Sequence, residues 1–356
     1  MKDFDYIIIG GGCSGLSLAF ELNKNNQLID KTLAIIEKRS SYHRDRTWSF
    51  WRVKQHNFED CVIKNWRNFT VNNSNETRNF TDTKFPYQSI NSELFYKKII
   101  KTLKKNNNIK FFKNIDEINI NGAIIFNSVF DHNIQKQNKL WQHFHGVEIE
   151  VENNTFDETT FNLMDFDCDQ KNSVHFFYTL PFTAKKALIE TTWLSEMKDE
   201  SEKKYKEQIN DYITKKYKIN NFTINYSEEG AIPLFFPPIN KISNIINIGS
   251  AGGMTRLSTG YTFLNIQEQS KYISKNLSNI KKAKKYQIPI KYKILDKIFL
   301  RVLKKYPYKM NNIFLKIFKA PITMVIKFLS NTSNIMEDLT VIIKMPKIIF
   351  IKEIFK

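Results

Sequence analysis

Cysteine is scarce in this chain of 356 residues, which has three cysteines far apart in the sequence (Cys13, Cys61 and Cys168). They form no CxxC pair, which argues against a disulfide scaffold or a zinc ribbon and fits a reducing compartment. The six histidines show no metal-ligand spacing, and we expect no metal site. Glycine and proline are also few, at 11 and 9 residues, which excludes collagen-like and linker-dominated architectures.

Long hydrophobic runs are missing too, and acidic residues are missing from one end of the chain. No window reaches about 18 uninterrupted apolar residues, so we expect no membrane-spanning helix. Residues 271–356 contain four acidic residues against 20 Lys and Arg, a net charge of +16, whereas residues 1–270 carry +2. The overall composition, 42% hydrophobic and 25% charged, is that of a globular protein.

The first 40 residues predict a βαβ unit. Residues 5–9 form a short β-branched run, which is typical of a buried parallel strand. Residues 16–23 then read as a helix and residues 33–36 as a second strand. Because acidic residues precede the first apolar run, we interpret this segment as the first strand of a domain and not as a signal peptide.

The turn after the first strand has the spacing Gly10-x-Gly12-x-x-Gly15, the fingerprint of a dinucleotide-binding loop. Gly10 permits the tight turn, Gly12 lets the backbone approach a pyrophosphate, and Gly15 lets the helix pack close to the strand. Ser14 belongs to the start of this helix, whose free N–H groups suit phosphates. Glu37, at the end of the second strand, is placed to accept hydrogen bonds from an adenosine ribose. The alternative is a glycine-rich turn that binds no ligand.

A second glycine-rich turn late in the chain favours FAD over NAD. Residues 244–248 read as a strand that runs into Gly249, Gly252 and Gly253, and residues 264–277 read as a helix. Single-domain NAD enzymes do not need such a turn, whereas flavoproteins that begin with a βαβ unit typically use a late strand-turn-helix to hold the flavin.

Several segments together resemble the lycopene cyclase family of carotenoid biosynthesis, specifically its FAD-dependent β-cyclases. They keep their order and approximate spacing over most of the chain. The segments are Asp45-Arg46-Thr47-Trp48-Ser49-Phe50-Trp51, residues 178–192, Glu229-Gly230-Ala231-Ile232-Pro233, residues 249–261 and residues 296–303. Two positions depart from related patterns. Glu190 is a single acid where plant relatives have two, and Ser250 stands where many flavin monooxygenases place Asp, which counts against a hydroxylase.

The resemblance implies a lycopene β-cyclase. Such an enzyme closes the linear ends of lycopene into β-ionone rings, giving β-carotene, in an acid-catalysed reaction without net oxidation. The resemblance also implies reduced FAD, whose negative charge stabilises a carbocation, with NADPH or another donor as reductant. The alternative is a flavin-dependent monooxygenase, halogenase or prenyl reductase acting on a lipophilic substrate. A third alternative is a non-enzymatic lipid- or nucleic-acid-binding protein.

The family match makes Glu190 the best candidate for the acid that protonates the alkene. Its apolar neighbours in a strand-like segment would raise its pKa by burial, although a surface glutamate on an edge strand would fit the same sequence. Glu229 is interpreted as a second acid or base, or as a residue that orients a backbone turn. Arg46 is expected to contact the flavin phosphates or ring, or to be solvated.

Four aromatic residues are expected to bind the polyene and the passing carbocation, because aromatic faces suit both. Ordinary core packing is the alternative for each of them. These residues are Trp48, Phe50, Trp51 and Tyr261.

The sequence thus predicts an α/β protein with a Rossmann-like FAD-binding βαβ fold, a β-rich substrate domain and a helical C-terminal region. We expect the FAD-binding part at 1–60 and 225–280, the substrate-binding part at 61–224 and the basic helical region at 281–356. This last region could present a solvated lysine face, bind nucleic acid or lie on a membrane.

The membrane interpretation fits the basic region best. Lysines interleaved with Ile, Phe and Leu are typical of an interfacial helix on anionic lipid, and we find no nucleic-acid-binding motif. We therefore expect a cytoplasmic protein, peripheral on the inner face of the cell membrane, that has lycopene and an anionic membrane surface as partners and binds no nucleic acid.

Overall fold

The computed structural model describes residues 2–130, 139–197, 199–238 and 242–354. The predicted βαβ unit is present as β2 (Tyr6–Ile9), α1 (Cys13–Lys24) and β3 (Leu33–Ile36). It belongs to a parallel five-stranded sheet in the order β17 (Ile245–Asn247), β11 (Ile124–Asn127), β2, β3 and β9 (Ile109–Phe112). Ile7 and Ile8 of β2 are both fully buried and belong to different hydrophobic clusters, so both faces of this sheet are covered.

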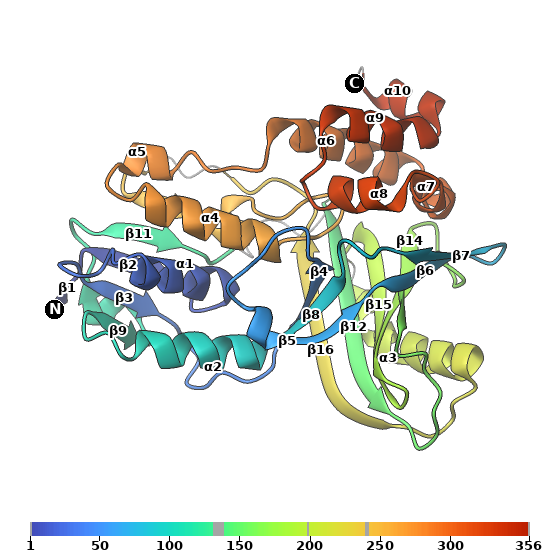
Figure 1. Cartoon of the computed structure of the whole chain (residues 1–356), viewed down its shortest axis with the longest axis horizontal. Coiled ribbons are helices and arrows are strands. Elements are labelled where there is room, and N and C mark those ends of the chain that lie inside the picture. The colour runs from blue at the N-terminus through green and yellow to red at the C-terminus, as the bar shows by residue number, and fades with distance from the viewer. Residues whose placement is uncertain (1, 131–138, 198, 239–241, 355–356) are drawn as a thin grey trace.

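Helices from three distant parts of the chain cover one face of this sheet. α1 packs against α2 (Ser92–Leu103) and, more extensively, against α4 (Phe263–Lys275). A short parallel pair, β1 (Lys2–Asp3) with β10 (Ile118–Asn119), adjoins the sheet, and α5 (Ile280–Ala283) follows α4. Figure 1 shows this unit on one side of the molecule and the large antiparallel sheet on the other.

The second unit is a seven-stranded, mostly antiparallel sheet. Its order is β16 (Thr223–Pro233), β12 (Leu140–Glu150), β15 (Lys186–Glu196), β14 (Val174–Thr183), β13 (Thr160–Asp165), β6 (Asn68–Asn72) and β7 (Thr77–Thr81). α3 (Asp199–Tyr212) packs on one face of β12 and β15. A small three-stranded sheet, β4 (Thr47–Trp51), β8 (Tyr87–Asn91) and β5 (Val62–Trp66), completes the strands described here.

The observed strand order differs from the expected segment limits in two places. β9 and β11 fall inside 61–224, the expected substrate-binding part, but they pair with β3 and β2 in the nucleotide-type sheet. Most of β16 falls inside 225–280, the later segment of the expected FAD-binding part, but the strand pairs along its length with β12 of the large sheet. Both differences have one cause. The chain crosses between the two sheets several times, and strand pairing, which the sequence does not display, decides where each segment belongs.

The predicted helical C-terminal region is present. It consists of α6 (Ile290–Lys305), α7 (Met310–Ile317), α8 (Ile322–Leu329), α9 (Ile335–Lys344) and α10 (Lys347–Ile354). Apolar residues of α6, α7 and α8 share one hydrophobic cluster with the large sheet, so these helices cover its upper end (Figure 1).

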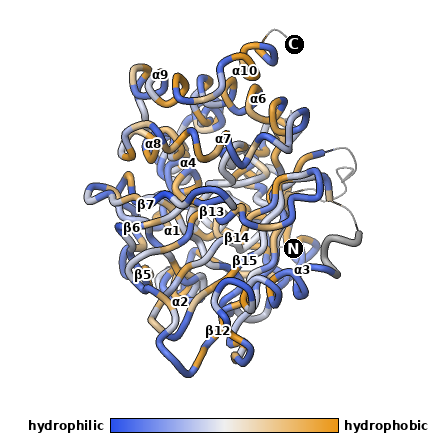
Figure 2. The backbone as a smooth tube through the Cα atoms, turned by 90° about the vertical axis from the view of Figure 1, so that its right-hand side faces the viewer, coloured by the Kyte–Doolittle hydropathy of each residue, from blue (hydrophilic) through white to orange (hydrophobic). Residues whose placement is uncertain are grey.

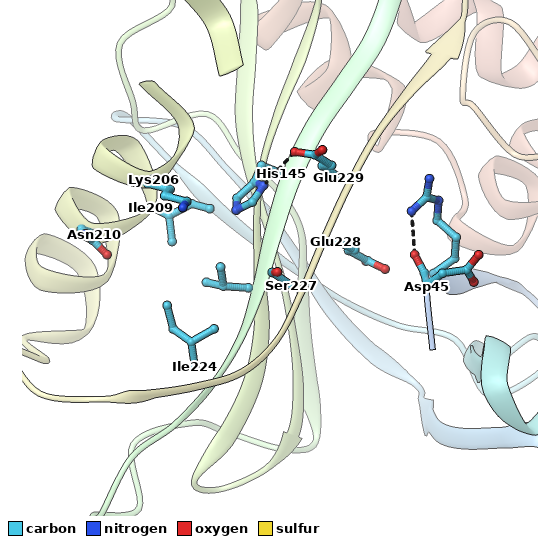
Figure 3. Close-up of a pocket in the computed structure, with 11 residues that line it drawn as sticks. Asp45, His145, Lys206, Ile209, Asn210, Ile224, Ser227, Glu228 and Glu229 are labelled. Carbon is cyan, nitrogen blue, oxygen red and sulfur yellow. Dashed lines mark hydrogen bonds and ion pairs between the residues drawn. The ribbon is translucent and has the colours of Figure 1, made fainter. Parts of the chain in front are cut away.

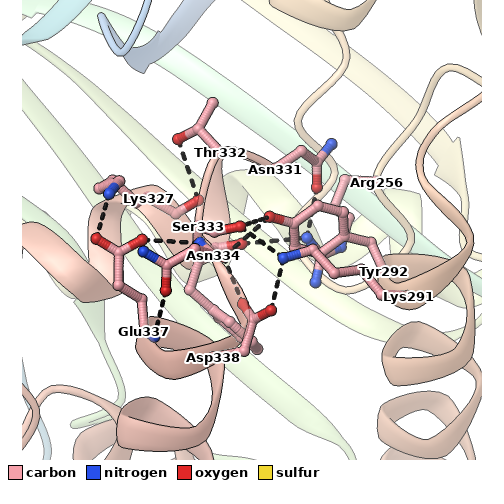
Figure 4. Close-up of polar contacts among 11 residues, drawn as sticks. Arg256, Lys291, Tyr292, Lys327, Asn331, Thr332, Ser333, Asn334, Glu337 and Asp338 are labelled. Atoms are coloured by element: carbon pink, nitrogen blue, oxygen red, sulfur yellow. Dashed lines mark hydrogen bonds and ion pairs between the residues drawn. The ribbon is translucent and has the colours of Figure 1, made fainter.

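A buried ion pair fastens this region to the loop before α4. Arg256 and Asp296 of α6 have side chains only 1% and 3% exposed, and Arg256 Nε donates to Asp296 Oδ1 at 2.6 Å. The same guanidinium lies 4.5 Å from the ring centre of Tyr292 and donates to Asn331 Oδ1 and to the carbonyl oxygen of Phe328 (Figure 4).

Removing one member of this pair should destabilise the protein strongly. Asp296→Asn leaves the buried charge of Arg256 uncompensated, and we expect a loss of about 3–5 kcal/mol in the free energy of unfolding. The measurement is the urea midpoint. The control is Lys54→Ala, which removes an exposed ion pair with Glu268 and should cost about 0–1 kcal/mol. Equal losses in both variants would contradict a structural role for the buried pair.

Candidate active site

The first glycine turn forms an open cradle at the N-terminus of α1. Gly10 has a φ of +95°, and a Cβ atom at Gly15 would lie 1.9 Å from the carbonyl oxygen of Gly10, so both positions need glycine for the fold itself. At Gly12 the nearest described atom to a Cβ would be Arg39 Nη2, at 3.9 Å. The surface of the loop is therefore open at Gly12, where a ligand would approach.

Two further observations at this turn fit a bound diphosphate. No side chain among the described residues caps the start of α1. The Ser14 hydroxyl is buried and has no hydrogen-bond partner among the described residues. Free N–H groups and an unpartnered hydroxyl at a helix N-terminus are donors that phosphate oxygens accept from.

Glu37 lies beside this turn, as the sequence predicts. Its carboxylate accepts hydrogen bonds from Gly11 N and Arg39 N, both at 2.9 Å. Burial tends to raise the pKa of Glu37, but the hydrogen bonds and charge of Arg39 outweigh burial and lower it. Arg39 also donates to the carbonyl oxygen of Gly11, so Arg39 is the arginine at the loop. Arg46 is exposed and donates to the carbonyl oxygen of Asp45, although it lines the edge of the central cavity described below.

The second glycine turn packs directly against the first. Gly249, with a φ of +61°, begins a short 3-10 turn to Gly252, and a Cβ at Gly249 would lie 2.6 Å from Ser14. A Cβ at Gly252 would lie 2.4 Å from the carbonyl oxygen of Asn247, and Gly253 has a φ of +74°. Gly249 therefore lets segments more than 230 residues apart meet at one place. Ser250 lines the central cavity described below.

A central cavity of about 730 Å³ extends from the first glycine turn to the C-terminal helices. The four predicted aromatic residues, Trp48, Phe50, Trp51 and Tyr261, all line it. The core-packing alternative also holds for two of them, because Phe50 and Trp51 are buried and pack against other aromatic rings. Further aromatic residues of the wall include Tyr87, Phe144, Phe176 and Tyr178, and the sequence interpretation did not single out Phe144 or Phe176.

Glu190 points into this cavity from the middle of β15. The residue is 8% exposed, and the Thr192 hydroxyl donates to Glu190 Oε1 at 2.5 Å. Burial, reinforced by the nearby carboxyl of Glu228, raises the pKa of Glu190 to about 8 and outweighs the opposing hydrogen bond. The side chain is thus an acid that keeps its proton near neutral pH.

Glu229 does not reach the central cavity, and it lies within strand β16 instead of in a turn. Its side chain is 74% exposed and lies 3.7 Å from His145 Nδ1 on the face that carries α3. Successive residues of a strand point to opposite faces, so Glu228, which is 6% exposed, is the glutamate that faces the cavity. Figure 3 shows Glu229 beside His145, whereas Glu228 points away from α3 towards Asp45. The sequence contains two adjacent glutamates here, and only the register of β16 shows which of them faces the cavity.

Comparison with known proteins identifies the family. The family model described as "Lycopene cyclase protein" matches residues 5–353. The chain belongs to the lycopene cyclase family. No curated protein matches the chain.

Solved structures similar to this lycopene cyclase family member include several flavoproteins. A geranylgeranyl bacteriochlorophyll reductase-like protein from Thermoplasma acidophilum is 12% identical, with a TM-score of 0.67 over 99% of this chain and 98% of that one. The flavin-dependent brominase Bmp2 is 12% identical, with a TM-score of 0.58 over 92% and 93% of the two chains. A flavoprotein/dehydrogenase from Cytophaga hutchinsonii is 11% identical, with a TM-score of 0.59 over 98% and 99%. The predicted FAD-binding fold class is thereby confirmed.

Two kinds of feature are absent from the described residues. No described helix is long and apolar enough to cross a membrane. Within the same residues, no three His, Cys, Asp or Glu side chains gather as a group that could hold a metal ion.

Proposed function

We propose that this protein is a lycopene β-cyclase, which converts linear ends of lycopene into β-ionone rings without net oxidation. The observation that carries the proposal is the position of Glu190. A carboxylic acid with its pKa raised to about 8 stands on the wall of a cavity that several aromatic side chains line, in a chain of the lycopene cyclase family.

We further propose that the protein binds FAD without a covalent bond. Gly12, Ser14 and the start of α1 would hold the diphosphate, Glu37 the ribose, and the turn at Gly249 the part of the cofactor nearer the cavity. When bound and reduced, the flavin would supply negative charge next to the cationic substrate. NADPH or another donor would keep it reduced.

In this proposal the residues of the chain deliver a proton and exclude water. Glu190 protonates the terminal double bond, which leaves a tertiary carbocation, and the next double bond attacks this carbon to close the ring. Loss of a ring proton completes the β-ionone end. Trp48, Phe50 and Tyr261 present aromatic faces to the polyene and the cation. Burial of Glu190 keeps the acid protonated until the alkene arrives.

A flavin-dependent monooxygenase, halogenase or reductase is the second candidate, because a brominase and a reductase-like protein share the fold. The amount of reduced nicotinamide consumed per molecule of product distinguishes the two functions. A redox enzyme consumes reduced nicotinamide in proportion to product, whereas a cyclase needs it only to keep the flavin reduced.

The C-terminal helices are proposed to lie on an anionic membrane surface, with the protein peripheral on the cytoplasmic face. Residues 271–356 carry a net charge of +16. Ile335, Leu339 and Ile343 follow one another at helical spacing on α9 and are exposed. The full set of exposed apolar side chains on α9 and α10 is Ile335, Met336, Leu339, Ile343, Ile348, Ile351 and Ile354. Figure 2 shows hydrophobic and hydrophilic residues interleaved along these helices at one end of the molecule.

The two glycines of the first turn give a test of the cofactor proposal. Gly12→Val places a side chain on the open surface of the loop, so flavin occupancy of the purified protein should fall at least tenfold while the circular dichroism spectrum is kept. Gly15→Val is the contrast, because it clashes with the carbonyl oxygen of Gly10 and should disrupt folding itself. Full flavin occupancy in a folded Gly12→Val protein would contradict the site.

Glu190→Gln tests the acid. The amide keeps the shape and hydrogen bonding of the side chain but cannot deliver the proton, so β-ring formation should fall by roughly 10²–10⁴-fold. Flavin content and thermal stability should stay near those of the wild type. The assay is pigment analysis in a lycopene-accumulating bacterium, and Glu190→Asp should retain partial activity.

The pH profile of the wild type provides an independent readout of Glu190. The acid form is present below its pKa of about 8, so the cyclisation rate should decline as the pH rises through about 8. A rate that rises through this range would assign the acid role to another group.

Membrane binding should depend on salt and on lipid charge. Each basic residue near an anionic surface contributes roughly 1 kcal/mol, so changing Lys344, Lys347 and Lys352 to Glu should greatly weaken binding in vesicle co-sedimentation. The matched control changes three other exposed lysines to Glu, at the end of α2 and just beyond it, namely Lys101, Lys104 and Lys105. This control should bind almost like wild type. Equal binding to neutral and anionic vesicles would remove the electrostatic part of the proposal.

A further inference from the structure

Two glutamates stand on the cavity face of the large sheet, on the two strands that flank β12. Three adjacent strands place Glu190 of β15, Gly146 of β12 and Glu228 of β16 directly opposite one another. Residues directly opposite in antiparallel strands share a face, so both carboxyl side chains rise from the same side. Both residues line the central cavity, and both are more than nine-tenths buried.

Gly146 places no side chain of its own between the two glutamates. A Cβ atom there would lie 3.3 Å from Leu188 Cδ1 and 3.5 Å from both Glu190 Cβ and Glu228 Cγ. Because neighbouring strands are about 4.8 Å apart, any larger residue at this position would stand between the carboxyl groups. The glycine therefore keeps β12 from inserting a side chain between the two carboxyls.

The surroundings of the two carboxyls differ in charge. The Tyr226 hydroxyl donates to Glu228 Oε2 at 2.8 Å, and the guanidinium of Arg44 lies 3.8 Å from the centre of the Tyr226 ring. Arg44 also forms an ion pair with Glu148 at 2.6 Å. Burial raises the pKa of Glu228 overall, but the hydrogen bond from Tyr226 and the charges of Arg44 and Arg46 oppose this rise.

Glu190 has less support for a negative charge. It accepts a hydrogen bond from Thr192, and the residue opposite it on β14 is Tyr178, whose hydroxyl donates to Tyr87. Two nearby carboxyls cannot both ionise freely, so the charge of the pair resides on Glu228 and the proton on Glu190.

We propose that Glu190 and Glu228 work as one proton-carrying pair, in which Glu190 donates a proton to the alkene and Glu228 accepts the proton that the ring later loses. This inference rests on the proposed cyclase function and adds the base to it.

The proton balance of the cycle closes without a co-reactant. First the O–H bond of Glu190 breaks and a C–H bond forms on the substrate, so two carboxylates face the cation. Next the ring C–H bond breaks, its electrons form the ring double bond, and the proton moves to Glu228. Transfer of this proton from Glu228 to Glu190, past Gly146 of β12, restores the starting state.

The pKa of Glu190 is the first readout, and it needs no substrate. Protein labelled with ¹³C at the glutamate carboxyls is titrated by NMR, and the Glu190 signal is assigned by its loss in Glu190→Gln. Glu228→Gln removes the neighbouring charge, so the pKa of Glu190 should fall by about one unit or more. Glu229→Gln, one residue along the same strand, should leave the pKa unchanged. An unchanged pKa in Glu228→Gln, or an equal fall in Glu229→Gln, would overturn the pair.

Turnover is the second readout. Glu228→Gln should lower cyclisation by roughly 10²-fold or more and move the alkaline decline of the rate to lower pH, while Glu228→Asp recovers part of the rate. Full activity in Glu228→Gln would overturn the role of Glu228 as base. If wild type itself makes no cyclic product, the proposed function fails, but the titration still decides whether the pair exists. Should Glu228→Gln fail to fold, Glu228→Ala, which also removes the charge, serves for the titration, and Glu228→Asp serves for turnover.

Discussion

A carboxyl group can hold a proton at neutral pH only where water is kept away from it, and this requirement governs the architecture of the protein. The large sheet supplies a dry face on which Glu190 stands between apolar neighbours, and the three-stranded sheet with Trp48 and Phe50 closes one side of the space above it. Helices α7 and α8 cover the far end with Phe314, Ile317 and Leu329. Each unit contributes a wall, so no single unit could provide the environment of this acid.

The cavity also depends on the loop between the second glycine turn and α4. Arg256 N donates to the carbonyl oxygen of Tyr261, and Leu257 N donates to Asp296 Oδ2. The buried ion pair with α6 thereby fixes the loop that presents Tyr261 to the cavity. The packing of the C-terminal helices and the geometry of the cavity therefore depend on each other, because Arg256 and Asp296 contribute to both.

Much of this structure could be predicted from local sequence patterns, whereas the rest depends on pairing between distant segments. The βαβ unit, the late glycine turn and the C-terminal helices could be predicted because glycine spacing and apolar periodicity are local signals. The membership of β9 and β11 in the first sheet could not, since it depends on partners about 80 to 120 residues away in sequence. The same applies to Glu228, which stands next to Glu229 in the sequence but on the opposite face of β16. Arg39 was missed because its contact with Gly11 arises only when β2 and β3 align.

The packing of Gly249 against Ser14 has a consequence for how the protein is made. Gln267 also donates to the Ser17 hydroxyl, and Ser274 to the carbonyl oxygen of Glu21, so α1 is completed by residues some 250 positions later. A ribosome adds about 5–20 residues per second, so the first helix waits on the order of ten seconds or more for its partner. The glycine turn that is translated first is therefore among the last parts to reach its final form, and the emerging chain must keep an apolar helix face uncovered throughout that interval.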